Sequence, residues 1–144
     1  MSTAAPPAPR TGPDVVVVGV DGSAASIAAL DWAVAEASRD ARALHVVVAH
    51  ERPPWASYAP PARDEAPEEQ KLSELVETVR PHLRKARADL VVRKGRLEQV
   101  LLWESADAGL LVVGREAAWP EIGPLARTCV ANAHCPVVVV TREG

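Results

Sequence analysis

Hydrophobic residues concentrate in five short runs along the chain, at residues 15–20, 44–49, 90–92, 110–113 and 137–140. Most of these runs are continuous rather than alternating, which is typical of strands covered on both faces. Between them, apolar residues recur at helical spacing. This pattern predicts helices over residues 24–39, 68–85, 96–107 and 123–133, and we expect Pro81 to kink or split the second of them.

The predicted order is strand and helix repeated four times, followed by a fifth strand. Strands that alternate with helices form right-handed crossovers and hence a parallel sheet. The expected fold is therefore an α/β three-layer sandwich with a five-stranded, mainly parallel sheet, either Rossmann-like or flavodoxin-like. We expect residues 1–13, with four prolines, to form a disordered tail and residues 14–144 to form one domain. Residues 51–67 carry too much proline for a helix or an inner strand.

Composition and charge narrow the function classes. The 144 residues carry a net charge of −3, which gives no electrostatic argument for a nucleic-acid or membrane partner. No apolar run approaches the ~20 residues of a membrane helix, and the N-terminus has no secretory apolar core. We therefore expect a cytoplasmic protein. Two cysteines are too few for a disulfide framework.

Ligands of such sheets bind at the carboxyl ends of the strands, so the loops that begin at Asp21, Ala49, Arg93 and Gly114 are the candidate site. Two interpretations of Asp21 remain open. It is either a ligand-binding or magnesium-linked carboxylate, or a turn-forming residue between strand and helix. Ser23 is a natural cap for the helix that follows.

Several stretches in this order resemble the universal stress protein family. They are residues 17–23 (VVGVDGS), 28–33 (AALDWA), 110–114 (LLVVG) and 134–140 (HCPVVVV). The resemblance covers residues 14–142. It implies a five-stranded parallel sheet with helices on both faces, usually in a dimer, in a family that divides into ATP binders and members that do not bind ATP.

The family's ATP loop reads G-x2-G-x9-G-[S/T], and this chain departs from it. Gly114 matches the first glycine, the second falls on Ala117, and the last corresponds to Gly123, so the loop is about four residues short. Pro124 replaces the hydroxyl residue. Trp119, Pro120 and Glu121 replace small loop residues, and Gly95-Arg96-Leu97 stands where family members often carry a Gly-Asp-Pro-like turn.

The resemblance implies that the adenine end of the cleft is retained while its triphosphate end is damaged. The expected cofactor-binding residues are Asp21, Gly22, Ser23, Ala49, Gly114 and Gly123. No cofactor is the first expectation, with ATP or AMP possible. The leading hypothesis is a non-catalytic stress-response protein with a degenerate ATP site that acts through protein interaction or small-adenylate sensing. The alternatives are an ATP binder with an altered loop and a small α/β enzyme that uses the same cleft.

The sequence lacks the residues that phosphoryl transfer, flavin binding, metal binding or catalysis would require. A phospho-acceptor domain needs a carboxylate after the third strand, where Arg93-Lys94 stands, and the first loop lacks the Ser/Thr run of a flavodoxin. Cys129, His134 and Cys135 are better explained as buried thiols and a helix-end histidine than as metal ligands. His45 and His82 have no acidic or nucleophilic companion nearby in sequence, so we expect no catalytic residues and no metal.

The last strand is expected at the edge of the sheet, where its apolar backbone edge must pair with something. The resemblance also implies dimerisation through this strand, which is common in the family. We therefore expect a homodimer through Pro136, Val137, Val138, Val139 and Val140. We expect Trp32 and Trp103 to pack in the core, with a partner surface as the alternative for Trp103. Trp119 is expected to plug or cover the cleft, unless it faces a partner or forms a loop tip.

Overall fold

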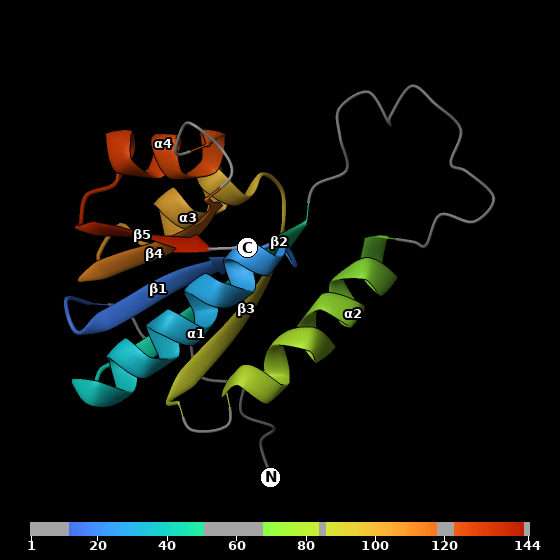
Figure 1. Cartoon of the computed structure of the whole chain (residues 1–144), viewed down its shortest axis with the longest axis horizontal. Coiled ribbons are helices and arrows are strands. Elements are labelled where there is room, and N and C mark those ends of the chain that lie inside the picture. The colour runs from blue at the N-terminus through green and yellow to red at the C-terminus, as the bar shows by residue number, and fades with distance from the viewer. Residues whose placement is uncertain (1–11, 51–67, 84–85, 118–122, 143–144) are drawn as a thin grey trace, which may run out of the picture.

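A computed structural model describes residues 12–50, 68–83, 86–117 and 123–142, and these form a parallel five-stranded sheet between two helical layers (Figure 1). The strand order is β3-β2-β1-β4-β5, and every pairing is parallel. In chain order the elements are β1 Val15–Val20, α1 Ala24–Arg39, β2 Ala43–His50, α2 Glu68–Val79, a 3-10 turn Arg80–Leu83, β3 Ala88–Lys94, α3 Leu97–Glu104, β4 Leu110–Glu116, α4 Pro124–Asn132 and β5 Val137–Arg142. The predicted fold class is confirmed.

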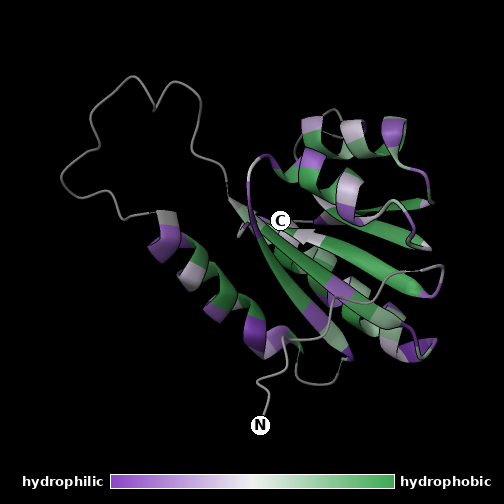
Figure 2. Cartoon of the chain, turned by 180° about the vertical axis from the view of Figure 1, so that it is seen from behind, coloured by the Kyte–Doolittle hydropathy of each residue, from purple (hydrophilic) through white to green (hydrophobic). Residues whose placement is uncertain are grey.

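The valine-rich β1 lies at the centre of the sheet and is buried along its whole length. Alternate β1 residues enter two separate cores. Val16, Val18 and Val20 pack in the core under α1 and α2, whereas Val15 and Val17 pack in the core under α3 and α4. Figure 2 shows the apolar strands between helices whose outer faces are more polar. The continuous apolar run therefore reflects burial on both faces, as predicted.

The largest differences from the predicted elements occur at prolines and at a sheet edge. The second helix ends at Val79 and continues as the 3-10 turn that contains Pro81, because proline cannot donate the helical hydrogen bond. The third strand is longer than expected, at Ala88–Lys94. It includes Asp89 and Arg93 because it forms an edge of the sheet, where only Val91 is buried and polar side chains are tolerated.

Two predictions of buried tryptophans were wrong. Trp32 on α1 is 36% exposed, and Trp103 on α3 is 82% exposed. The core positions of these helices are held instead by smaller residues: Leu30 and Ala33 on α1, and Leu101 on α3. A bulky indole does not fit between a helix and a sheet that approach this closely, so both rings lie on outer faces.

Parts of the predicted organisation lie outside the described residues. They include tail residues 1–11, the proline-rich segment 51–67 and the stretch 118–122, which contains Trp119. Within the described part of the chain, none of the helices has the length and apolar character needed to cross a membrane.

The contact between Gly19 and Leu101 sets the distance between β1 and α3. A Cβ atom at Gly19 would lie 2.4 Å from Leu101 Cδ1, and Leu101 is fully buried. We expect Gly19→Ala to lower the free energy of unfolding by about 1–3 kcal/mol through overpacking. Leu101→Ala should lower it by about 3–5 kcal/mol through loss of packing and an unfilled cavity.

Urea unfolding of both single variants and the double variant tests this contact. The methyl group at position 19 partly fills the space left at position 101, so the double variant should lose clearly less stability than the sum of the single losses. Strict additivity would show that the two positions do not share this space.

Cys129 on α4 is fully buried in the core under α3 and α4. Burial, with smaller contributions from Glu98 and Cys135, raises the pKa of its thiol from 9.0 to about 11. The folded state therefore holds this proton more tightly than the unfolded state. The resulting stability is fully present below pH 9.0 and is lost as the pH rises towards about 11.

We expect urea unfolding to show a marked loss of stability between neutral pH and pH values above 9.0, and Cys129→Ala should reduce that loss. A two-unit shift corresponds to about 3 kcal/mol at most. Cys135→Ala is the matched control and should retain most of the loss, because Cys135 is only partly buried. An equal alkaline loss in Cys129→Ala and the wild type would contradict this explanation.

Candidate functional site

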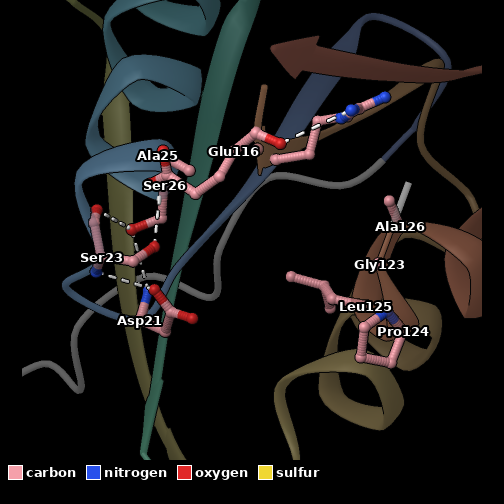
Figure 3. Close-up of a pocket in the computed structure, with 11 residues that line it drawn as sticks. Asp21, Ser23, Ala25, Ser26, Glu116, Gly123, Pro124, Leu125 and Ala126 are labelled. Atoms are coloured by element: carbon pink, nitrogen blue, oxygen red, sulfur yellow. Dashed lines mark hydrogen bonds between the residues drawn. The ribbon is translucent and has the colours of Figure 1, made fainter. Parts of the chain in front are cut away.

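A cavity of about 310 Å³ opens where the carboxyl ends of β1 and β4 separate. The ladder between these strands pairs only Val16–Val18 with Leu110–Val112, so beyond it the two chains diverge. After β1 the chain continues into α1 on one face of the sheet, and after β4 it continues into α4 on the other face (Figure 1). The described lining residues are Asp21, Ser23, Ala25, Ser26, Gly114, Arg115, Glu116, Gly123, Pro124, Leu125 and Ala126 (Figure 3).

The β1 side of the cavity is a tightly hydrogen-bonded turn. Asp21 Oδ1 accepts from the Ser23 backbone N–H at 2.9 Å, and Ser23 Oγ accepts from the Ser26 N–H at 3.1 Å. Ser26 Oγ donates to the Ser23 carbonyl at 2.8 Å and accepts from the Asp21 N–H at 3.3 Å. These contacts give Asp21 the turn-forming role and Ser23 the helix-capping role, and both residues still line the cavity (Figure 3).

The β4 side depends on two glycines. A Cβ atom at Gly114 would lie 2.1 Å from the Ala25 carbonyl oxygen, so only glycine lets α1 approach β4 this closely. Gly123 precedes α4 with φ 87°, a conformation that favours glycine, and Pro124 occupies the first turn of that helix. In the described part of the chain, no side chain caps the N-terminus of α4.

The loop was expected to begin at Gly114, but β4 continues to Glu116 because residues 114–116 pair with Val140, Thr141 and Arg142 of β5. This extension places two charged side chains at the cavity. Glu116 Oε2 lies 3.1 Å from Arg142 Nη1 of β5, and Arg115 Nη2 lies 3.5 Å from the Glu116 carbonyl. Two carboxylates, Asp21 and Glu116, thus face the cavity beside one arginine.

The structure brings four of the six predicted ligand residues together. Asp21, Ser23, Gly114 and Gly123 line the cavity. Gly22 and Ala49 are not among its described lining residues: Gly22 adopts φ 91° in the turn, and Ala49 is buried in the core under α3 and α4. Sequence reasoning missed Ser26, Arg115 and Glu116, although the positions of Arg115 and Glu116 just after a predicted strand end were a usable signal.

His45 and His82 each lie beside an acidic side chain that is distant in sequence. His45 is 2% exposed, and its Nε2 lies 3.2 Å from Glu104 Oε2, within ion-pair distance but without hydrogen-bond geometry. Glu104 Oε1 also accepts from Arg93 Nε at 3.1 Å. His82 Nδ1 lies 2.6 Å from Asp31 Oδ1 and ties the 3-10 turn to α1. Neither histidine lines the cavity between β1 and β4.

The prediction of buried thiols holds for Cys129 and only in part for Cys135. Cys129 is buried, Cys135 is partly buried, and both are free thiols. Among the described residues, no group of three or more His, Cys, Asp or Glu side chains is placed to hold a metal ion.

Comparison with known proteins identifies the family. The family model described as "Universal stress protein family" matches residues 13–141. Universal stress protein Rv2624c of Mycobacterium tuberculosis is 32% identical over 129 residues, which are 87% of this chain and 47% of that protein. The chain therefore spans about half the length of this curated relative.

Solved structures support the fold. Universal stress protein UspA from Lactobacillus plantarum matches with a TM-score of 0.64 at 16% identity, over 91% of this chain and 99% of that one. A universal stress protein family protein from Arabidopsis thaliana with AMP bound matches with a TM-score of 0.59 at 18% identity, over 89% and 91%. With the family model covering almost the whole chain, these findings show that the chain belongs to the universal stress protein family.

Proposed function

We propose that this chain is a homodimeric, non-catalytic, cytoplasmic protein of the stress response that senses a small adenylate in the cavity between β1 and β4. It would pass this signal on through contact with another protein. The observation that carries the proposal is the cavity itself, which combines the glycines expected of a nucleotide site with a carboxylate and a proline where a phosphate chain would lie.

Size and position favour a nucleotide-like ligand. The cavity volume of about 310 Å³ is at the lower end of the range typical of small-molecule sites. The cavity also lies at the switch point of the sheet, where parallel α/β proteins bind ligands. The Arabidopsis thaliana relative in this fold carries AMP.

Charge favours a ligand with few phosphates. The described lining residues carry two carboxylates, Asp21 and Glu116, against one arginine, and Glu116 is paired with Arg142. Each additional phosphate would therefore add repulsion from Asp21 and, more weakly, from Glu116. Pro124 has no N–H to donate at the first turn of α4. We infer that the site prefers AMP or a similar adenylate to ATP.

The polar groups in the cavity support a binding role over a catalytic one. The Ser23 and Ser26 hydroxyls are committed to capping α1, and neither is activated by a histidine in the described structure. Nucleophilic catalysis by a serine needs a general base within hydrogen-bond distance of its hydroxyl.

One observation favours ATP binding through an altered loop as the second candidate. The N-terminus of α4 faces the cavity without a side-chain cap among the described residues, and its free backbone N–H groups and helix dipole attract anions. The ligand experiment below separates the two candidates.

The geometry of β5 supports the homodimer. β5 is an edge strand, and its four valines are only partly buried. The Leu111 N–H bonds the Pro136 carbonyl, and the Ala117 N–H bonds the Arg142 carbonyl. Even-numbered β5 residues therefore pair with β4, and Val139 turns its N–H and C=O to the free edge. Such an edge can pair with a second copy.

The ligand preference can be tested by thermal unfolding with saturating AMP or Mg-ATP. A ligand at about 100 times its dissociation constant stabilises by about 2.7 kcal/mol, which raises Tm by about 5–10 °C. We expect this rise with AMP and a smaller one with ATP at equal concentration. Glu116→Gln should raise the ATP response towards the AMP response, because it removes a repulsive charge.

Glu77→Gln is the charge-matched control, since Glu77 lies on α2 and does not line the cavity. It should leave both responses unchanged. An ATP response equal to or larger than the AMP response would favour the second candidate, and no response to either nucleotide would refute adenylate sensing.

The dimer can be tested at Val139 by sedimentation of the wild type and two variants. Val139→Pro removes an N–H that faces the free edge and leaves the β4 ladder intact, so we expect a monomer at micromolar concentration. Val139→Ala retains the N–H and should remain dimeric. A monomeric wild type would refute the dimer, and a dimeric Val139→Pro variant with an unchanged Tm would place the interface elsewhere.

A further inference from the structure

The C-terminal end of α3 presents an exposed tryptophan on the outer surface. Leu97 and Leu101 bury one side of the helix against the sheet, whereas Trp103 on the other side is 82% exposed. A single exposed apolar residue needs no explanation by itself. Three further features of this helix end, however, point to one kind of occupant.

The first feature is a cavity beside the indole ring. It has a volume of about 330 Å³ and is lined by Trp103, Glu104, Ala106 and Asp107. It is large enough to admit the end of a long side chain. Among its described lining residues, two carry carboxylates and none carries a positive charge.

The second feature is the direction of the local electric field. Glu104 and Asp107 lie at the C-terminal end of α3, where the helix dipole is negative, and the last turn of α3 contains no basic residue. Carboxylates at this end repel the dipole, and a bound cation would relieve that repulsion. The face of an indole ring also attracts cations.

The third feature is the way in which the Glu104 carboxylate is held. Its side chain is 12% exposed and lies between Arg93 Nε at 3.1 Å and His45 Nε2 at 3.2 Å. The buried His45 ring has no hydrogen-bond partner for either nitrogen among the described residues. Arg93 offsets the charge of Glu104, so Asp107 gives the cavity its net negative charge.

We propose that this cavity, named here the Trp103 cavity, binds an arginine side chain presented by a partner protein. A guanidinium is planar, so it can stack on the indole ring while its N–H groups reach the Asp107 carboxylate. The proposal rests on the proposed function in one respect only, namely that the chain acts by contacting another protein.

A protein is a better occupant than a free amine because the neighbouring helix also exposes an apolar side chain that a larger partner could cover. α4 packs beside α3 in the same helical layer and exposes 54% of Val130. Exposed tryptophan and a cationic partner are a frequent combination at the energetic centre of protein interfaces. A small amine would leave most of this apolar surface in water.

The test is an NMR titration of the full chain with acetyl-Gly-Arg-Gly-amide, observed at the indole N–H resonances. The Trp103 resonance is assigned by its loss in Trp103→Phe. We expect a saturable shift of this resonance and of the Asp107 amide at millimolar peptide. The same peptide with citrulline in place of arginine, which has the same shape without the charge, should bind at least about threefold more weakly.

Variants locate the interaction. Asp107→Asn should weaken binding by about threefold and Trp103→Ala by about tenfold, while Trp32→Phe, at the other exposed tryptophan, should have no effect. Unchanged Tm values show that each variant folds. No shift with the arginine peptide, or an equal shift with the citrulline peptide, would overturn the proposal.

Two further titrations separate this proposal from a polyamine site and from the proposed nucleotide site. Spermidine that binds the same resonances more tightly than the peptide would replace the protein partner with a free polyamine and overturn the proposal. AMP should leave the Trp103 resonance in place, because the cavity between β1 and β4 is lined by different residues. A failed nucleotide titration and a failed peptide titration are therefore separate results.

Discussion

The rest of the structure depends on burying β1 on both faces. A strand of four valines followed by Gly19 and Val20 is stable only where a helical layer covers each side of the sheet. α1 and α2 supply one layer, and α3 and α4 supply the other. Because β1 is central, the chain must change direction beside it, between β1 and β4. The cavity proposed to bind an adenylate is the direct consequence of this arrangement.

The same close packing explains which positions must be small. Gly19 admits the buried Leu101 side chain, and Gly114 admits the Ala25 carbonyl of α1. Gly114 therefore has a packing role that is independent of any phosphate, and a glycine at this position alone does not identify a nucleotide loop. The distinction between binding and packing has to come from its neighbours, of which Glu116 and Pro124 argue against a phosphate chain.

Much of the fold could be predicted from the sequence because strands such as residues 15–20 and 137–140 carry their burial pattern in adjacent residues. Four residues predicted to bind a ligand could also be placed at one cavity, since three of them, Asp21, Ser23 and Gly114, lie just after predicted strand ends. The pairs His45–Glu104 and His82–Asp31 could not, because their members are about 50 to 60 positions apart and meet only after the helices pack. The exposure of Trp32 and Trp103 was missed because helical spacing does not report the width of the gap beneath each helix.

Parallel topology also gives the carboxyl and amino ends of the strands opposite electrostatic preferences. Every helix in such a fold begins near the carboxyl ends of the strands and ends near their amino ends. The carboxyl ends of the sheet therefore favour anions, and the amino ends favour cations. In this chain we expect Glu116 and Pro124 to weaken anion binding at the carboxyl ends of the strands, while Asp107 adds negative charge just beyond the end of α3. The two proposals therefore agree with each other: a site that prefers few phosphates lies at one end of the strands, and an acidic helix end that accepts a basic partner lies at the other.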